Sequence, residues 1–193
     1  MKPNVTKKQQ GLLIQSSTQR VLEVLFRYPE KEFSLSDLAK EARVAKPHIG
    51  KILQELEHLE YIDITKLAKI WRIKTNQQHW NFMKSKIIYN LNFIYQSGLV
   101  EFLNGYFGNP KVIVLFGSFR RGEDISSSDI DIAIEIDEIE EYKTMELREL
   151  TLFEKEIKRP IQIHLFNRKN VDVHVFNNIA NGIVLFGFLE VKP

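Results

Sequence analysis

Two apolar strand-like segments joined by a polar loop stand out between Val112 and Ile136, where the sequence is VIVLFGSFRRGEDISSSDIDIAIEI. The first segment, Val112–Phe116, is uninterrupted and largely β-branched, which is typical of a strand buried on both faces. Gly117 ends it, and glycine allows a sharp turn or close approach of a ligand to the backbone. Ser118 adds a hydroxyl beside free backbone N–H groups, at the start of a short helical turn expected over 119–123. The pattern predicts a phosphate-binding turn.

The second segment begins with two aspartates separated by one apolar residue. Because alternate side chains of a strand share one face, Asp129 and Asp131 are expected to project together, while Ile130, Ile132 and Ile134 pack into the sheet. Paired carboxylates suit Mg²⁺ (or Mn²⁺), and water and phosphate oxygens complete the coordination shell of such an ion. The segment therefore predicts a site for a metal-bound nucleoside triphosphate. In the alternative interpretation, the aspartates form the solvent face of an edge strand and Gly117 makes an ordinary turn.

The stretch GSFRRGEDISSSDIDIAIEI resembles the signature of the DNA polymerase beta superfamily of nucleotidyltransferases, particularly its small prokaryotic minimal nucleotidyltransferases. The resemblance covers roughly residues 99–189. It implies transfer of a nucleoside monophosphate from a nucleoside triphosphate, with release of pyrophosphate. It also implies that Gly117 and Ser118 bind the triphosphate and that Asp129 and Asp131 are catalytic, metal-binding carboxylates. Further phosphate contacts are expected from Arg120, Arg121 and Ser128.

The resemblance also implies a third carboxylate, on the strand that follows the next helix. This chain has Ile161-Gln162-Ile163-His164-Leu165 there, so Gln162 occupies the matching position and His164 shares its face. A glutamine oxygen can bind a metal ion or a water but carries no charge, and histidine binds Mg²⁺ poorly. Metal binding is expected from Asp129, Asp131 and Gln162, with an incomplete set of carboxylates. Catalysis is therefore less firmly implied than nucleotide binding.

The remaining C-terminal pattern predicts an α/β domain with a mixed sheet over residues 99–193. We expect helices over 99–106, 138–157 and 171–180, and strands over 112–116, 129–135, 161–166 and 183–191. A connecting helix over 80–95 is expected within the segment 76–98. The apolar and polar segments of this region fit a small sheet with helices packed on it.

The N-terminal segment, residues 1–75, predicts three helices followed by a β-hairpin. The first helix is expected over 17–26, with Ser17 or Thr18 as its N-cap. The second is expected to begin with Ser36 as its N-cap, and the third to run from Lys46-Pro47 to Leu59. The hairpin strands are expected over 61–65 and 70–74, with a basic tip over 66–69. The sequence SLSDLAKEARVAKPHIGKILQELEHLEYI and this order resemble the winged helix-turn-helix family, which implies binding to double-stranded DNA.

In that family the third helix enters the major groove and the wing contacts the backbone or minor groove. The expected DNA contacts are therefore Lys46, His48, Lys51 and Gln54 on the helix and Lys66, Lys69 and Arg72 on the wing. Charge supports this partner, since residues 1–75 carry 14 basic against 9 acidic residues and the rest carries 13 against 16. The alternative is a module that dimerises or contacts a protein, with its lysines simply solvated.

The sequence has no cysteine and no apolar segment near the roughly 18 residues that a membrane span needs, so we expect a cytoplasmic protein. Two functions stay open. One is a nucleotidyltransferase coupled to DNA through the winged helix. The other is a DNA-binding regulator, possibly antitoxin-like, whose transferase domain only binds nucleotide because Gln162 replaces the third acid. The minimal nucleotidyltransferase resemblance also implies a small helical protein partner, as in toxin-antitoxin pairs, and a homodimer is a further possibility.

Overall fold

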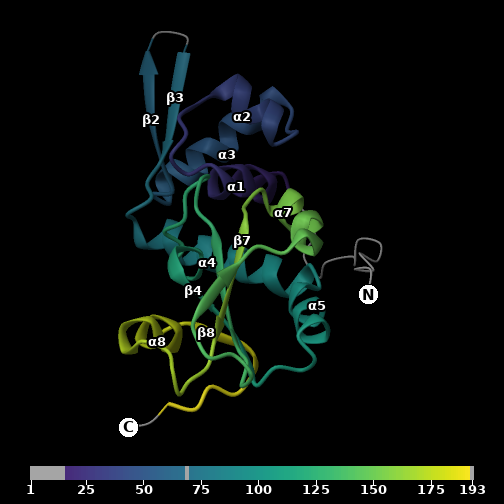
Figure 1. The fold of residues 1–193 in the computed structure, drawn as a ribbon. Helices are drawn as coiled ribbons and strands as arrows, with labels where there is room; N and C mark the ends of the chain where they lie inside the picture. The colour runs from purple at the N-terminus through teal and green to yellow at the C-terminus, as the bar shows by residue number, and fades with distance from the viewer. Residues whose placement is uncertain (1–15, 68–69, 192–193) are drawn as a thin grey trace. The chain divides into compact units, whose positions relative to one another are not determined.

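The structure is a computed structural model that describes residues 16–67 and 70–191 (Figure 1). The described residues divide into two compact units, with the boundary between Tyr89 and Asn90. This boundary lies inside helix α4 (Trp80–Gln96), within the segment 76–98 that the sequence predicts to be a connecting helix. In the described part of the chain, no helix is both long enough and apolar enough to cross a membrane.

The N-terminal unit contains three helices and a small antiparallel sheet. Its elements are α1 (Ser17–Arg27), β1 (Phe33–Ser34), α2 (Leu35–Glu41), α3 (Lys46–His58), β2 (Ile62–Leu67), β3 (Ile70–Thr75) and the first part of α4. The sheet has the order β1-β3-β2, with Ile64 paired to Ile73 in the β2–β3 hairpin. Side chains from α1, α2, α3 and the hairpin share one hydrophobic core, which includes Leu25, Leu38, Leu53 and Ile73. The structure thus contains the three helices and the following β-hairpin that the sequence pattern predicts.

Two predicted N-caps in this unit are wrong by one or two residues. The Ser16 hydroxyl caps α1 by accepting from the Gln19 backbone N–H, and the Ser34 hydroxyl caps α2 by accepting from the Asp37 N–H. Both serines have extended backbones, as an N-cap requires, whereas Ser17 already lies inside α1 and Ser36 inside α2. Sequence spacing alone could not separate neighbouring serines.

The C-terminal unit is a five-stranded mixed sheet with helices around it. Besides the last part of α4, its elements are α5 (Leu99–Tyr106), β4 (Val112–Phe116), α6 (Gly117–Arg121), β5 (Ile130–Glu135), β6 (Lys143–Met145), the 3-10 helix η1 (Arg148–Leu150), α7 (Thr151–Ile157), β7 (Ile161–Phe166), α8 (Val173–Ala180) and β8 (Ile183–Gly187). The strand order is β6-β7-β5-β4-β8, with β5 and β7 parallel and the other pairs antiparallel. The unit is thus of the mixed α/β class that the sequence predicts.

The predicted helix over 138–157 is wrong in its first two thirds. Only α7 is an α-helix there, and β6 pairs instead with the edge of β7, Lys143 opposite Leu165. The carbonyl groups of Asp137 and Ile139 accept hydrogen bonds from the side-chain amide of Asn167, and the Glu140 carbonyl accepts one from Asn170. These side chains and the neighbouring strand satisfy the backbone in place of a helix, so tertiary contacts override the helical charge pattern.

Other boundaries also differ from the predictions, among them three in the C-terminal unit. Helix α6 begins at Gly117 rather than at Phe119, and Gly122 in the left-handed region ends it. Strand β5 begins one residue after Asp129. Strand β8 ends at Gly187 rather than at Val191. Gly187 has φ +77°, and a Cβ there would lie 2.0 Å from the Lys111 carbonyl oxygen, so the strand turns away at this close approach.

Candidate nucleotide and metal site

The centre of the candidate site is the contact between the end of β4 and the start of β5. Phe116 is the antiparallel partner of Asp131, so Gly117 lies next to this aspartate. Gly117 has φ +73°, and a Cβ atom added to it would lie 2.1 Å from Asp131 Oδ2. Only glycine fits both the backbone conformation and the space. The Gly-Ser turn and the second aspartate therefore lie together, as the sequence pattern predicts.

Asp129 is exposed and follows a turn that a serine closes. The Ser128 hydroxyl accepts a hydrogen bond from the Ile125 N–H, and the Ser128 N–H donates to the Ile125 carbonyl, both at 3.0 Å. Ser128 thus holds the backbone that leads to Asp129. Its predicted contact with phosphate stays a prediction.

Gln162 lies beside Asp131 on the neighbouring strand. The two residues are register partners in the parallel β5–β7 pair, so their side chains leave the same face of the sheet. This position is the one that the superfamily resemblance assigns to the third acid. Its role as a metal ligand stays a prediction.

His164 makes the closest contact to Asp131 from that strand. Its Nε2 atom lies 3.1 Å from Asp131 Oδ1, and its Nδ1 atom is hydrogen-bonded to the Tyr142 hydroxyl. The imidazole is buried, and its ring packs edge-on against Phe116 with 4.8 Å between centroids. Burial, with the Asp131 charge as a second cause, raises the pKa of Tyr142. The sequence pattern indicated His164 as a site candidate but not Tyr142, because Tyr142 lies in the segment 138–157 that was predicted to be a helix.

The two arginines of α6 differ in their surroundings. Arg121 is exposed and its Nε donates to the Glu123 carboxylate at 2.7 Å. The Nε atom of Arg120 is buried and has no hydrogen-bond partner among the described residues. Binding of phosphate by Arg121 would therefore compete with an exposed ion pair, which typically contributes only about 0.2–1 kcal/mol.

A buried polar cluster supports the loop between α6 and Asp129. The Asn90 amide donates to the Phe119 carbonyl at 2.8 Å and to the Asp124 carboxylate at 2.9 Å. Arg159 lies 3.4 Å from the same carboxylate, and both side chains of this ion pair are almost fully buried. The cluster fixes the loop from inside the unit, and no periodicity or motif in the sequence indicates it.

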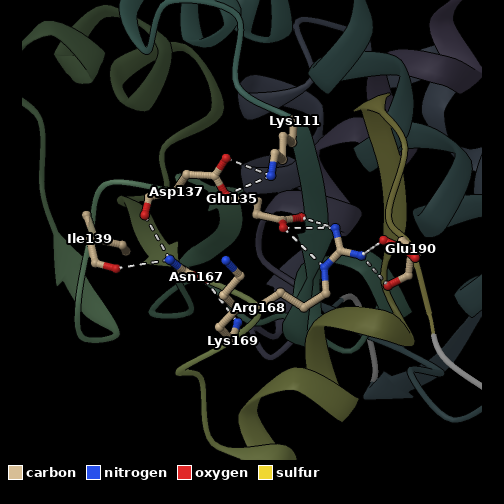
Figure 2. Close-up of polar contacts among 8 residues, drawn as sticks. All are labelled: Lys111, Glu135, Asp137, Ile139, Asn167, Arg168, Lys169 and Glu190. Carbon is tan, nitrogen blue, oxygen red and sulfur yellow. Dashed lines mark hydrogen bonds and ion pairs between the residues drawn. The ribbon is translucent and has the colours of Figure 1, made fainter.

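The far end of β5 carries a separate ion-pair cluster (Figure 2). Glu135, with 2% of its side chain exposed, accepts hydrogen bonds from Arg168 at 2.9 and 3.0 Å, and Arg168 also binds Glu190. Burial lowers the pKa of Arg168, but hydrogen bonds and charges from Glu135 and Glu190 outweigh burial, so the pKa is raised overall. Beside them, an ion pair with Lys111 lowers the pKa of Asp137. These residues hold the sheet and the C-terminal segment together, and the Glu135 carboxylate is occupied by its ion pair with Arg168.

Some of the predicted DNA-contacting residues are exposed, and others already contact a side chain of the same unit. Lys46, His48, Lys51 and Gln54 are all exposed on α3. Arg72 binds Glu32, and Lys66 lies over the Trp71 ring with Nζ 4.6 Å from its centroid. Lys69 lies outside the described residues. Arg43 is exposed just before α3 with φ +53°, a basic position that the sequence analysis did not select.

A comparison with known families finds a match over the C-terminal unit. Residues 98–188 match the family described as "Polymerase beta, Nucleotidyltransferase". The match spans Gly117, Ser118, Asp129, Asp131 and Gln162, and it supports nucleotidyl transfer at the level of the family.

Two further comparisons are less informative. No curated protein matches the sequence. A solved structure of a ZitR mutant from Lactococcus lactis in complex with DNA is similar over 53% of this chain and 68% of that chain. The sequence identity is 12% and the TM-score is 0.36, a likeness too low to indicate a shared fold.

Proposed function

We propose that this chain transfers a nucleoside monophosphate from a metal-bound nucleoside triphosphate to an acceptor hydroxyl. The observation that carries the proposal is the packing of Gly117 against Asp131, which brings a phosphate-binding type of turn and a carboxylate to one point. The family match over residues 98–188 supports the same reaction class. The acceptor and the base of the nucleotide stay open.

The residues at this point fit a Mg²⁺ or Mn²⁺ ion. Asp129 is exposed and Asp131 is partly exposed, so both carboxylates can offer hard oxygen ligands without first breaking a buried ion pair. The bound ion would neutralise charge on the triphosphate oxygens. Gly117 lets the Asp131 carboxylate lie directly against the backbone of the turn, and the Ser118 hydroxyl is the nearest side-chain donor in the sequence. Arg120 and Arg121 are candidates for additional phosphate contacts.

The proposed function includes binding of double-stranded DNA by the N-terminal unit. The exposed side chains of Lys46, His48, Lys51 and Gln54 on α3 are suited to phosphate oxygens and base edges. Arg72 and Lys66 would have to leave Glu32 and Trp71 to contact a phosphate, so we rank them below the helix residues. The DNA would bring the transferase to its acceptor or make the chain a regulator of its own operon.

A second candidate function is a DNA-binding regulator that senses nucleotide without transferring it. The observation that favours it is Gln162, a neutral residue directly beside Asp131. Among residues 16–67 and 70–191, no three or more His, Cys, Asp or Glu side chains are grouped to hold a metal ion. A small helical partner and a homodimer are compatible with either function.

Release of pyrophosphate separates the two candidates. The full chain would be incubated with each nucleoside triphosphate, labelled at the α-phosphate, in the presence of Mg²⁺ or Mn²⁺ and a cell extract. Transfer predicts pyrophosphate together with label on a protein, nucleic acid or small molecule. Nucleotide binding without pyrophosphate would favour the regulator, and the Asp129→Asn chain is the control for contaminating enzymes.

A further inference from the structure

We infer that this site takes a single divalent cation with its nucleotide and that His164 is the residue that positions Asp131 for that cation. The inference rests on the proposed function, because it concerns the same metal-nucleotide site. It goes further by assigning the number of ions and a role for a side chain that the nucleotidyltransferase signature does not contain.

The two carboxylate oxygens of Asp131 have different surroundings. Oδ1 lies 3.1 Å from His164 Nε2, whereas Oδ2 faces the Cα atom of Gly117. An ionised carboxylate only accepts hydrogen bonds, so Nε2 carries the hydrogen in this contact. His164 therefore fixes the rotation of the carboxylate and leaves the second oxygen toward the Gly-Ser turn.

Tyr142 fixes the imidazole in turn. In the tautomer that carries its hydrogen on Nε2, the Nδ1 atom of His164 accepts a hydrogen bond from the Tyr142 hydroxyl. The imidazole is only 8% exposed and also packs against Phe116, which restricts rotation of the ring. The result is a supported hydrogen bond to a metal-ligand candidate, an arrangement that commonly sets the affinity of a metal site.

The charge that a second ion would need is missing around this carboxylate. Gln162, the register partner of Asp131, is neutral. Glu135, on the same face of β5, is held by three hydrogen bonds from Arg168 (Figure 2). Carboxylate oxygens are the protein ligands that most offset the dehydration of a divalent cation. Among the described residues of this site, Asp129 and Asp131 are the carboxylates without a competing cationic partner.

The acids in the loop before Asp129 are also engaged elsewhere. Asp124 is buried against Asn90 and Arg159, and Glu123 pairs with Arg121. Neither carboxylate can reach the metal without losing its present partner. For Asp124, this would also open a buried cluster and leave a charged guanidinium without its anion.

The number of ions can be counted directly. The full chain would be saturated with a nucleoside triphosphate analogue whose α,β-bridging oxygen is replaced by methylene, and Mn²⁺ binding would be followed by electron paramagnetic resonance. We expect about one tightly bound Mn²⁺ per chain and a second in the Gln162→Asp chain. Two tightly bound ions in the parent would overturn the single-ion inference.

The role of His164 needs a measurement other than activity. His164→Phe keeps a ring of similar size but removes the hydrogen bond, so Mn²⁺ affinity in the nucleotide complex should fall by about 10–100-fold. His164→Gln can restore an N–H donor and should recover most of that loss. Tyr142→Phe, which removes only the outer hydrogen bond, should cause a smaller loss.

The remaining outcomes are separable. Unchanged Mn²⁺ affinity in His164→Phe, with the fold verified by thermal unfolding, would overturn the positioning role. An equal loss in His164→Phe and His164→Gln would do so as well, because it would show that the hydrogen bond is not what matters. A parent chain that binds neither nucleotide nor Mn²⁺ would instead overturn the proposed function on which the inference rests.

Discussion

The Cα atom of Gly117 lies so close to Asp131 that an added Cβ would be 2.1 Å from the Oδ2 atom of the carboxylate. Gly117→Ala should therefore push the carboxylate away from the Gly-Ser turn and remove metal-dependent nucleotide binding. It should also cost about 1–2 kcal/mol of unfolding free energy, because a side chain strains a left-handed backbone. Calorimetry with Mg²⁺ and nucleotide measures the first effect, and urea unfolding measures the second.

Gly108 supplies a matched control for this variant. Its φ is +67°, but a Cβ there would meet nothing within 4 Å. Gly108→Ala should thus show similar backbone strain with normal nucleotide binding. Equal binding in the two variants would contradict the proposed arrangement of Gly117 and Asp131.

Tyr142 provides a pH-dependent test of the same geometry that needs no metal. Burial and the Asp131 charge raise its pKa, so the folded chain holds the hydroxyl proton more tightly than the unfolded chain does. This contribution to stability is complete below about pH 10, the usual pKa of tyrosine, and is lost as the pH rises through the folded pKa. Urea unfolding should show a smaller alkaline loss in Tyr142→Phe than in the parent.

Asp131→Asn extends the test to the cause of the shift. Removal of the carboxylate charge should lower the pKa of Tyr142 toward its usual value and leave the effect of burial. Ultraviolet absorbance of the phenolate, with Tyr142→Phe as the reference, reports this pKa. An unchanged Tyr142 titration would mean that the carboxylate and the hydroxyl are farther apart than in this structure.

The buried pair of Glu135 and Arg168 is predicted to support stability rather than activity. Arg168→Met would leave the Glu135 carboxylate buried without its partner, at a cost of about 3–5 kcal/mol. The double variant Glu135→Leu and Arg168→Met should recover much of this loss, since an apolar pair can replace a buried ion pair. Urea midpoints measure both effects.

Glu190→Ala is the control for that cluster. The Glu190 side chain is 64% exposed, and its backbone carbonyl would still accept a hydrogen bond from Arg168, so loss of the carboxylate should cost below about 1 kcal/mol. A larger effect from Glu190 than from Arg168 would place the stabilising contact at the surface instead of at Glu135.

The sequence predicted the backbone around the candidate site well where local pattern determines structure. The apolar run of β4, the glycine turn and the alternation of Asp129 to Ile134 are short-range signals, and the structure brings Gly117, Asp131 and Gln162 together as expected. The helices α1, α3, α4 and α5 follow hydrophobic spacing and were also predicted closely. Such signals are carried within a few residues.

The sequence predicted poorly where distant partners decide the outcome. The segment 138–142 resembles part of a charged helix, but side chains of Asn167 and Asn170 bind its carbonyls. For the same reason Tyr142 escaped notice, since its partner His164 lies on another strand. The cluster of Asn90, Asp124 and Arg159 joins three segments far apart in the chain, and no spacing rule reveals it.

The N-terminal unit gives a prediction about DNA. If α3 lies on a duplex, Lys51→Ala should weaken binding and reduce the dependence of log K on log salt by about one unit per lost phosphate contact. Glu57→Ala, also exposed on α3 but acidic, is a control that should not weaken binding. Fluorescence anisotropy with a labelled duplex at several salt concentrations measures these effects.

Lys69 is a second residue that the sequence predicts to contact DNA, and Lys69→Ala is expected to lower the same slope by about one if Lys69 contacts one phosphate. Failure of the folded parent to bind any duplex at low salt would exclude the DNA-binding role. The nucleotidyltransferase proposal would be unaffected by that result.

The most direct test of the nucleotide site is calorimetry of Mg²⁺-dependent nucleoside triphosphate binding by Asp129→Asn and Asp131→Asn. Each change keeps the side-chain shape and removes one negative charge, so the affinity should fall at least about tenfold while the fold is retained. Asp137→Asn, an exposed acid paired with Lys111 beyond the other end of β5, is the matched control and should bind like the parent. Equal affinity in the parent and both site variants would contradict the metal-nucleotide site and favour the edge-strand interpretation of the two aspartates.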